Sequence, residues 1–223
     1  DLTVQEAHDT SMWGAVVAPA VVLQSLRVQI HASLSVTRLL SVLAHGNLSC
    51  STGSSIAAAS AAVELTVGSL LSCGGGTSIT AGSLDMQASR VVLGASVSLD
   101  ASSGMTVRAN ESMVCGAGSS IAAASAAVEL SVGSLLSCGD ATSITAGSFH
   151  ASGGVQNGLL RTNGMVCRLP SVSVSGKVSV SSFDQVILSG SVAAANIFLA
   201  FTQELFVLDS IEAATIDVSS RNL

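Results

Sequence analysis

The chain has 223 residues, of which 48% are hydrophobic and 10% are charged, and its formal net charge is −6. This length suits one domain, or one elongated repeat domain, with a sizeable core. The eight basic residues are scattered along the chain, so the sequence offers no basic stripe for nucleic acid. So few charges leave much of the surface to small residues, which favours assembly with other protein chains.

Residues 1–25 differ in composition from the rest of the chain, because they contain the only Trp and three acidic residues. Atypical terminal segments often cover the open ends of repeat arrays, so we predict an N-terminal cap or extension here. A first residue other than Met is expected either for a processed N-terminus or for a chain that has been shortened. The most apolar runs, at 14–23 and 192–201, are each about half the length of a membrane-spanning helix. We therefore expect no transmembrane segment.

Residues 26–190 show short bursts in which apolar and small polar residues alternate. Two clear examples are 63–67 (VELTV) and 105–109 (MTVRA). This period of two predicts β-strands. Gly-Ser, Ala-Ser or Ser-Ser pairs separate the bursts, and hairpin signals are rare. The strands are therefore expected to be joined by corners.

A duplication gives the length of one coil. Residues 53–83 recur at 118–148 with three differences, which indicates a recent duplication or a shared constraint. Nine short strands fill this 65-residue period, which is three coils of three strands at about 22 residues per coil. The arithmetic predicts an all-β, triangular parallel β-helix, that is, a β-solenoid. The alternative, an antiparallel sandwich, requires longer strands and true hairpins.

The cysteines distinguish a single-chain coil from three interwound chains. The interval from Cys50 to Cys73 equals that from Cys115 to Cys138, and each matches one coil of about 22 residues. In a single-chain coil each pair would lie on neighbouring coils, whereas in an interwound trimer about 14 Å would separate its members. The match to one coil favours the single chain. Each pair is then either a disulfide or two buried small hydrophobic residues, and Cys167 is left over.

Two sequons, at Asn47 and Asn110, are candidate N-glycosylation sites. With them we expect a glycoprotein of the extracellular space or an organelle lumen. Residues 191–223 are predicted to form the C-terminal end of the solenoid. Their Phe198, Phe201 and Phe206 would either cap the last coil or form a docking patch.

Candidate catalytic residues are few. The four histidines lie far apart, no Cys or His spacing suits zinc, and no G-x-S-x-G elbow occurs. The nearest approach to an acidic cluster is a set that we interpret as solvated charges: Asp85, Asp100, Glu111 and Asp140. We therefore expect no catalytic or metal-binding residues, no cofactor and no enzymatic activity.

Residues 77–112, TSITAGSLDMQASRVVLGASVSLDASSGMTVRANES, resemble the repeated strands of sarcoglycan ectodomains and, more distantly, of trimeric β-helical spike proteins. Both families keep short x-Val-x-Leu-x-Ala-Ser units separated by Gly or Ser. The resemblance implies an extracellular, non-enzymatic β-helix that assembles with other chains. The sequence lacks the N-terminal membrane anchor and terminal cysteine cluster of sarcoglycans, so the resemblance assigns no functional residues.

Two classes of function are expected from these features. The first is a structural or assembly protein whose weakly charged faces pack against partner chains in a complex, filament or coat. The second is a carbohydrate-binding adhesin or an ice-binding surface protein, although Thr does not recur once per coil as an ice-binding face would favour.

Overall fold

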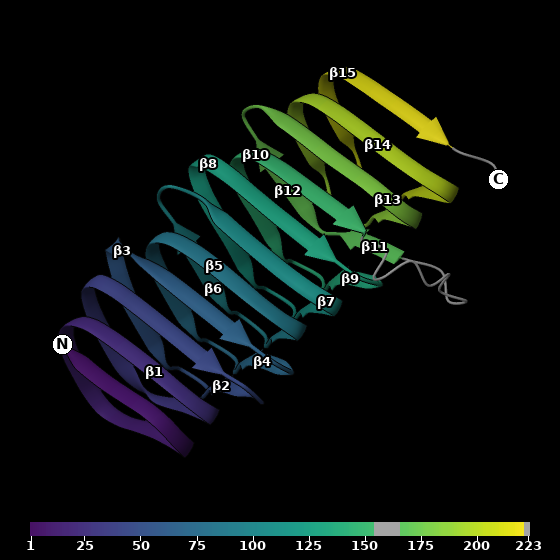
Figure 1. Ribbon diagram of the computed structural model, residues 1–223. Helices are drawn as coiled ribbons and strands as arrows, with labels where there is room; N and C mark the ends of the chain where they lie inside the picture. The colour runs from purple at the N-terminus through teal and green to yellow at the C-terminus, as the bar shows by residue number, and fades with distance from the viewer. Residues whose placement is uncertain (154–165, 221–223) are drawn as a thin grey trace.

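The computed structural model describes residues 1–153 and 166–220, and in these ranges the chain is all-β. The strands form a single parallel sheet that is wound into a solenoid (Figure 1). Its strands are β1 (Leu2–Ala44), β2 (Leu48–Cys50), β3 (Ser55–Val67), β4 (Leu70–Cys73), β5 (Ser78–Leu93), β6 (Ser98–Ala101), β7 (Met105–Cys115), β8 (Ser120–Val132), β9 (Leu135–Cys138), β10 (Ser143–Gly153), β11 (Val166–Leu169), β12 (Ser171–Val174), β13 (Lys177–Leu188), β14 (Val192–Val207) and β15 (Ile211–Ser220).

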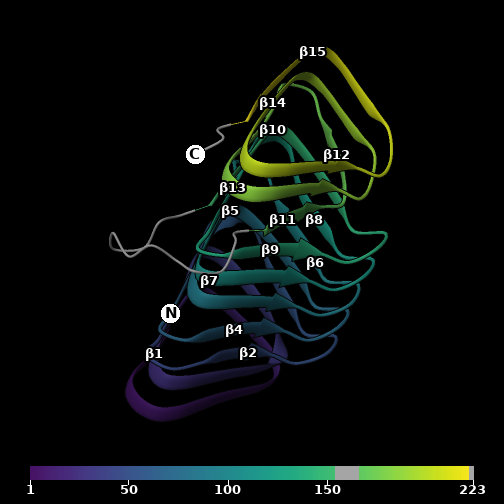
Figure 2. The same ribbon diagram turned by 90° about the vertical axis from the view of Figure 1, so that its right-hand side faces the viewer.

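Each coil is roughly triangular and has three faces (Figure 2). We call the face that contains β6 and β12 the serine face, and the face that contains β2, β4, β9 and β11 the cysteine face. The third, the acidic face, is formed by parts of longer strands, such as residues 63–67 of β3 and 84–88 of β5. Longer strands turn a corner and contribute to more than one face, and β1 alone has 43 residues.

The register between coils follows the duplication. Ile56 pairs with Ile79, Ile79 with Leu99, and Leu99 with Ile121. Three steps therefore cover the 65-residue period, and the two copies occupy the same faces three coils apart. The predicted parallel β-solenoid with three short strands per coil is confirmed, and it has about ten coils.

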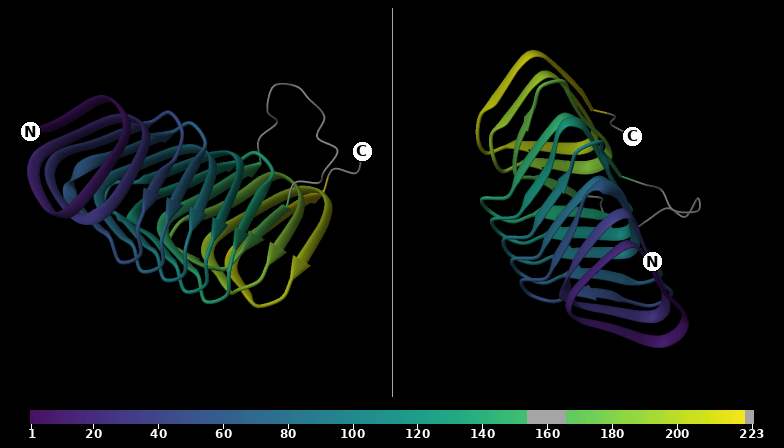
Figure 3. Two further views of the ribbon diagram at one scale, coloured as in Figure 1. Left: turned by 90° about the horizontal axis from the view of Figure 1, so that it is seen from below. Right: turned by 90° about the vertical axis from the view of Figure 1, so that its left-hand side faces the viewer.

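The cysteine pairs show that one chain makes every coil. Cys50 is the register partner of Cys73, and Cys115 is the register partner of Cys138. Neighbouring strands lie about 4.8 Å apart, so each pair spans one coil and not the about 14 Å expected for an interwound trimer. The two termini accordingly lie at opposite ends of one stack (Figure 3). The single-chain coil is confirmed.

The core is built from columns of inward-facing side chains. Alternate residues of each strand point inward, so in-register pairing places one buried residue above another. On the serine face one column is Leu or Ile over six successive coils, and each member is at most 1% exposed: Leu34, Ile56, Ile79, Leu99, Ile121 and Ile144. Burial of one such side chain contributes about 1.5–3 kcal/mol, so the columns explain why a chain with few charges folds.

Glycine is required where the chain turns from the cysteine face to the serine face. A column of four glycines stands at this corner: Gly74, Gly94, Gly116 and Gly139. A Cβ atom on any of them would lie 2.5–2.9 Å from a backbone nitrogen of the preceding coil. Buried hydroxyl groups bind the carbonyl groups of the same corner, and Thr77 donates to the oxygens of Ser51 and Gly74. The predicted corners therefore have a definite hydrogen-bond pattern.

The predicted terminal segments consist of the same strand type as the rest. Residues 2–25 lie in β1, and β14 and β15 make up most of 191–220 and keep the parallel register. No break in β1 marks residue 25. That these segments act as caps stays a prediction, and residues 221–223 of the second lie outside the described ranges.

Candidate functional site

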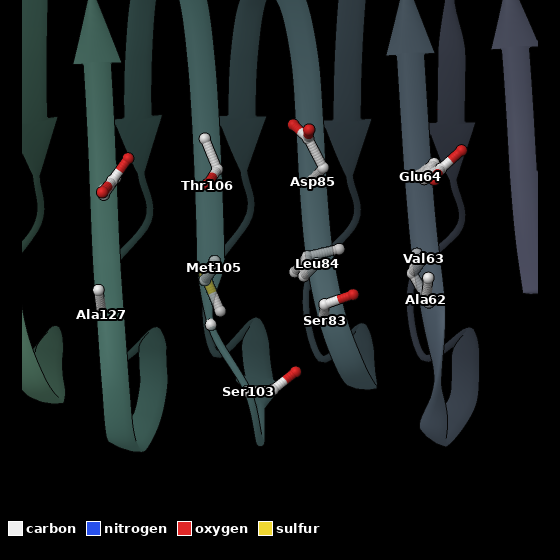
Figure 4. A pocket seen from close by; sticks show the side chains of 12 residues that line it. Ala62, Val63, Glu64, Ser83, Leu84, Asp85, Ser103, Met105, Thr106 and Ala127 are labelled. Carbon is white, nitrogen blue, oxygen red and sulfur yellow. The ribbon is translucent and has the colours of Figure 1, made fainter.

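A shallow groove runs across several coils of the acidic face. It has a volume of about 390 Å³, opens to solvent and is bordered by carboxylates and small side chains. Register places Glu64 beside Asp85, Asp85 beside Thr106, and Thr106 beside Glu129. Figure 4 shows the first three of these residues on neighbouring strands, at the same level along the strand direction. The small residues Ala62, Ser83 and Ala127 leave the groove open along one side.

The groove carries negative charge that is neutralised only in part. Arg108 Nη1 lies 3.4 Å from each carboxylate oxygen of Asp85, and both side chains are about half exposed. Such an exposed pair contributes at most about 1 kcal/mol to stability. Glu64 and Glu129 have no ion pair within the described residues. The row formed by Glu64, Asp85, Thr106 and Glu129 can therefore attract cationic groups of a ligand.

The row of Glu64, Asp85, Thr106 and Glu129 is not a metal-binding cluster among the described residues. Across residues 1–153 and 166–220, no group of three His, Cys, Asp or Glu side chains is placed to hold a metal ion. The acidic residues singled out from the sequence do not converge either. Asp85 lies on the acidic face, Asp100 on the serine face, and Glu111 and Asp140 at two different corners.

Sequence reasoning missed the row because its members lie far apart along the chain. Glu64 and Asp85 are separated by one coil, and Asp85 and Glu129 by two coils. A search for acidic residues at multiples of the coil length would have found them.

Four of the five cysteines lie in one buried column on the cysteine face, in which Leu93 separates the two pairs. Cys167 lies in the neighbouring column, beside Leu136. All five are free thiols in the structure. A hydrogen bond with Cys50 and burial raise the pKa of Cys73 well above its ordinary value. The pKa of Cys115 is raised in the same way by Cys138 and burial, and that of Cys167 by burial and by nearby Cys138. Thiols of this kind are poor nucleophiles.

The in-register pairs also have Cα atoms within reach of a disulfide, at about 4.8 Å against a usual range of about 4.4–6.8 Å. Disulfides at Cys50 and Cys73 and at Cys115 and Cys138 stay a prediction.

The two sequons occupy the same corner, between the acidic and cysteine faces. Asn47 and Asn110 are both exposed. The Asn47 Oδ1 atom accepts a hydrogen bond from the Leu70 amide at 3.3 Å, which leaves the amide nitrogen of the side chain for a glycan. Glycosylation at this corner stays a prediction.

The three phenylalanines near the C-terminus point in different directions. Phe201 faces inward and is 9% exposed, whereas Phe206 is 44% exposed on the cysteine face. Phe198 lies on the acidic face, with the Lys177 ammonium 5.2 Å from its ring centroid. The structure therefore does not bring the three together, and their roles in capping or docking stay predictions.

The serine face carries a regular outer ladder. Seven serines follow one another in register through Ser33, Ser55, Ser78, Ser98, Ser120, Ser143 and Ser171. The parallel outer row holds Ser35, Ala57, Thr80, Asp100, Ala122, Thr145 and Ser173. Over these seven coils the two rows contain a single charged residue. They form a continuous strip of small side chains along the solenoid.

Comparison of the chain with protein-family models, with curated proteins and with solved structures gave no match. The resemblance to sarcoglycans thus stays a prediction. In the part of the chain that the structure describes, there is no helix long and apolar enough to span a membrane.

Proposed function

We propose that this protein is a structural or assembly protein, a β-solenoid that packs its serine face against partner chains in a larger complex, filament or coat. The observation that carries the proposal is the double ladder of small side chains, in which Asp100 is the one charge over seven coils. Interface cores are depleted of charged residues, and sheets with small side chains can pack closely face to face.

The size of the ladder sets the strength of this contact. Seven coils at about 4.8 Å and a strand width of about 10–12 Å give on the order of 400 Å² per molecule. A standard interface buries roughly 800 Å² per partner. One pair of serine faces is therefore a weak contact, and stable assembly requires several such contacts. We expect self-association that rises steadily with concentration.

The position of the sequons supports the choice of face. Asn47 and Asn110 lie at the corner opposite the serine face. Glycans are bulky, and glycans at that corner would leave the ladder uncovered. The proposal thus agrees with the predicted extracellular or lumenal location, which itself remains a proposal.

The duplication supplies a matched experiment. Ala57 and Ala122 hold the same place in the two copies, so Ala57→Glu with Ala122→Glu puts two new charges on the ladder. Ser72→Glu with Ser137→Glu puts the same charges on the cysteine face. Sedimentation velocity from dilute to concentrated solution should show weaker association for the first variant and wild-type association for the second. A wild-type protein that stays monomeric throughout would overturn the proposal.

The second candidate is the surface-binding class, a carbohydrate-binding adhesin or an ice-binding protein. The same ladder favours it, because hydroxyl groups repeat at one spacing over seven coils. The threonines do not add a column: Thr77 and Thr142 are buried at a corner, whereas Thr80 and Thr145 lie on the serine face. Thermal hysteresis, or binding on a glycan array that the Ala57→Glu, Ala122→Glu variant loses, would favour this class over assembly.

A further inference from the structure

A serine and a histidine meet at the corner between the cysteine and serine faces near the N-terminal end. His31 belongs to β1, and Ser51 directly follows β2 on the next coil. Their neighbours Ile30 and Cys50 are register partners, so the two residues stack. The Ser51 Oγ atom lies 2.5 Å from His31 Nδ1. Sequence reasoning missed this pair because its members are one coil apart along the chain.

The hydrogen-bond partners favour one tautomer of the neutral imidazole. The Gln29 Oε1 atom lies 3.4 Å from His31 Nε2, and Ser11 donates to the same oxygen at 3.4 Å. A carboxamide oxygen can only accept, so Nε2 carries the proton and Nδ1 presents its lone pair. The Ser51 hydroxyl is therefore the donor to Nδ1. This is the arrangement in which a histidine can take a proton from a serine.

Both groups are held in place by their neighbours. The Trp13 ring stacks on the His31 ring with centroids 3.9 Å apart and planes inclined by 8°. The Ser51 backbone donates to Ile30 at 2.8 Å and accepts from Thr77 Oγ1 at 3.1 Å. A rigid nucleophile and a fixed base are what general-base activation requires.

Solvent reaches this corner, because His31 and Ser51 are each half-buried. Gly74, the register neighbour of Ser51 on the next coil, packs tightly against the backbone, since an added Cβ atom there would lie 2.5 Å from the Thr52 nitrogen. A small planar ester would therefore approach Ser51 from the solvent side.

We propose that Ser51 is a nucleophile activated by His31 and that it accepts the acyl group of a small activated ester. The Ser51 oxygen forms a bond to the carbonyl carbon while its proton moves to His31 Nδ1. The tetrahedral intermediate then collapses, the bond to the leaving oxygen breaks, and the leaving group takes the proton from His31. Water can repeat the sequence on the acyl-serine, which gives a carboxylic acid and regenerates Ser51. This activity goes beyond the proposed assembly function and does not depend on it.

The test uses p-nitrophenyl acetate as the probe, with peptide mapping by mass spectrometry. The full chain should release p-nitrophenolate and carry an acetyl group on Ser51 in preference to every other serine. Ser51→Ala should abolish that label. His31→Gln should slow acylation at least 10-fold, which is less than the about 10²–10⁴-fold of general-base catalysis because water reaches this half-buried site. His45→Gln, which removes an exposed histidine at another corner, should leave the rate unchanged.

The distribution of acetyl groups over the serines of the wild-type protein tests the proposal even if a variant fails to fold. Acetylation spread evenly over the serines, or a rate that survives in His31→Gln, would overturn the proposal and indicate ordinary background chemistry. Ser51→Cys keeps a nucleophile at this position and should again be acylated there. Circular dichroism of each variant establishes that the solenoid is intact.

Discussion

Replacement of Gly68 by alanine should break the corner between the acidic and cysteine faces. A Cβ atom at Gly68 would lie 2.0 Å from the carbonyl oxygen of His45, on the preceding coil. Backbone forms that contact, so no side-chain rotation can relieve it. Gly133, the same residue in the second copy, would place its Cβ 1.8 Å from the oxygen of Asn110.

The cost follows from how far the coils must separate. Ordinary contact begins near 3.4 Å, so the two coils would have to move apart by about 1.4 Å, enough to break neighbouring hydrogen bonds. Two such bonds hold this corner, from Gly68 to Ala44 and from Ser69 to Gly46, each at 2.8 Å. At about 1 kcal/mol net for each bond and about 1–3 kcal/mol for overpacking, Gly68→Ala should cost about 3–5 kcal/mol. The melting temperature should fall by about 10 °C.

The matched control is Gly53→Ala. Gly53 has a φ of +73° and nothing within 4 Å of an added Cβ, so its substitution carries only the backbone penalty of about 1 kcal/mol. Its corner tolerates other residues, since Ser96 and Ala141 also have positive φ there. Urea unfolding followed by circular dichroism compares the variants. If Gly68→Ala and Gly133→Ala lost no more stability than Gly53→Ala, the inference that the coils approach closely at this corner would be wrong.

Further predictions concern buried polar groups. Ser54→Ala should stabilise the protein by about 1 kcal/mol because its buried hydroxyl has no partner among the described residues. Ser119→Ala, its counterpart in the second copy, should destabilise by about 1–2 kcal/mol because the single proton of that hydroxyl is shared between two carbonyl oxygens; equal effects in urea unfolding would contradict this. Since the folded state raises the pKa of Cys73, Cys115 and Cys167, the unfolded chain loses thiol protons first. The free energy of unfolding of the protein should therefore be steady below about pH 8.5 and fall above that pH by up to about 1.4 kcal/mol per pH unit for each thiol. A variant with all three cysteines changed to Ala should show a smaller fall. A thiol reagent should label no cysteine in the folded protein and all of them after unfolding without reductant, and a lower count would indicate disulfides.

The fold could be predicted because its rule is local and repeats. Alternation of apolar and small residues marks the strands. The 65-residue spacing between the two copies gives the length of three coils without any structural knowledge. The interval between Cys50 and Cys73 then equals the register step. Each of these signals depends only on distance along the chain.

The sites could not be predicted because they depend on how coils of unequal length align. The hydrogen-bonded residues Gly147 and Ser175, on neighbouring coils, are 28 positions apart, whereas Asn196 and Thr215 are 19 positions apart. A constant coil of about 22 residues would misplace side chains by several positions. An error of one position moves a residue from the surface to the core. The carboxylates of the groove and the Ser51–His31 pair were missed for this reason.

The two copies show why such a chain can duplicate a segment. Each coil contacts only its neighbours, so a copied segment such as 53–83 keeps the contacts within it. Only the edges of the copy meet a different coil. Ser119 donates to the Gly94 and Gly116 carbonyls, whereas Ser54, in the same place of the first copy, lies above a coil of different sequence and finds no partner among the described residues. Duplication therefore preserves the interior contacts and leaves its mismatch at the boundary, where one unpaired hydroxyl is the cost.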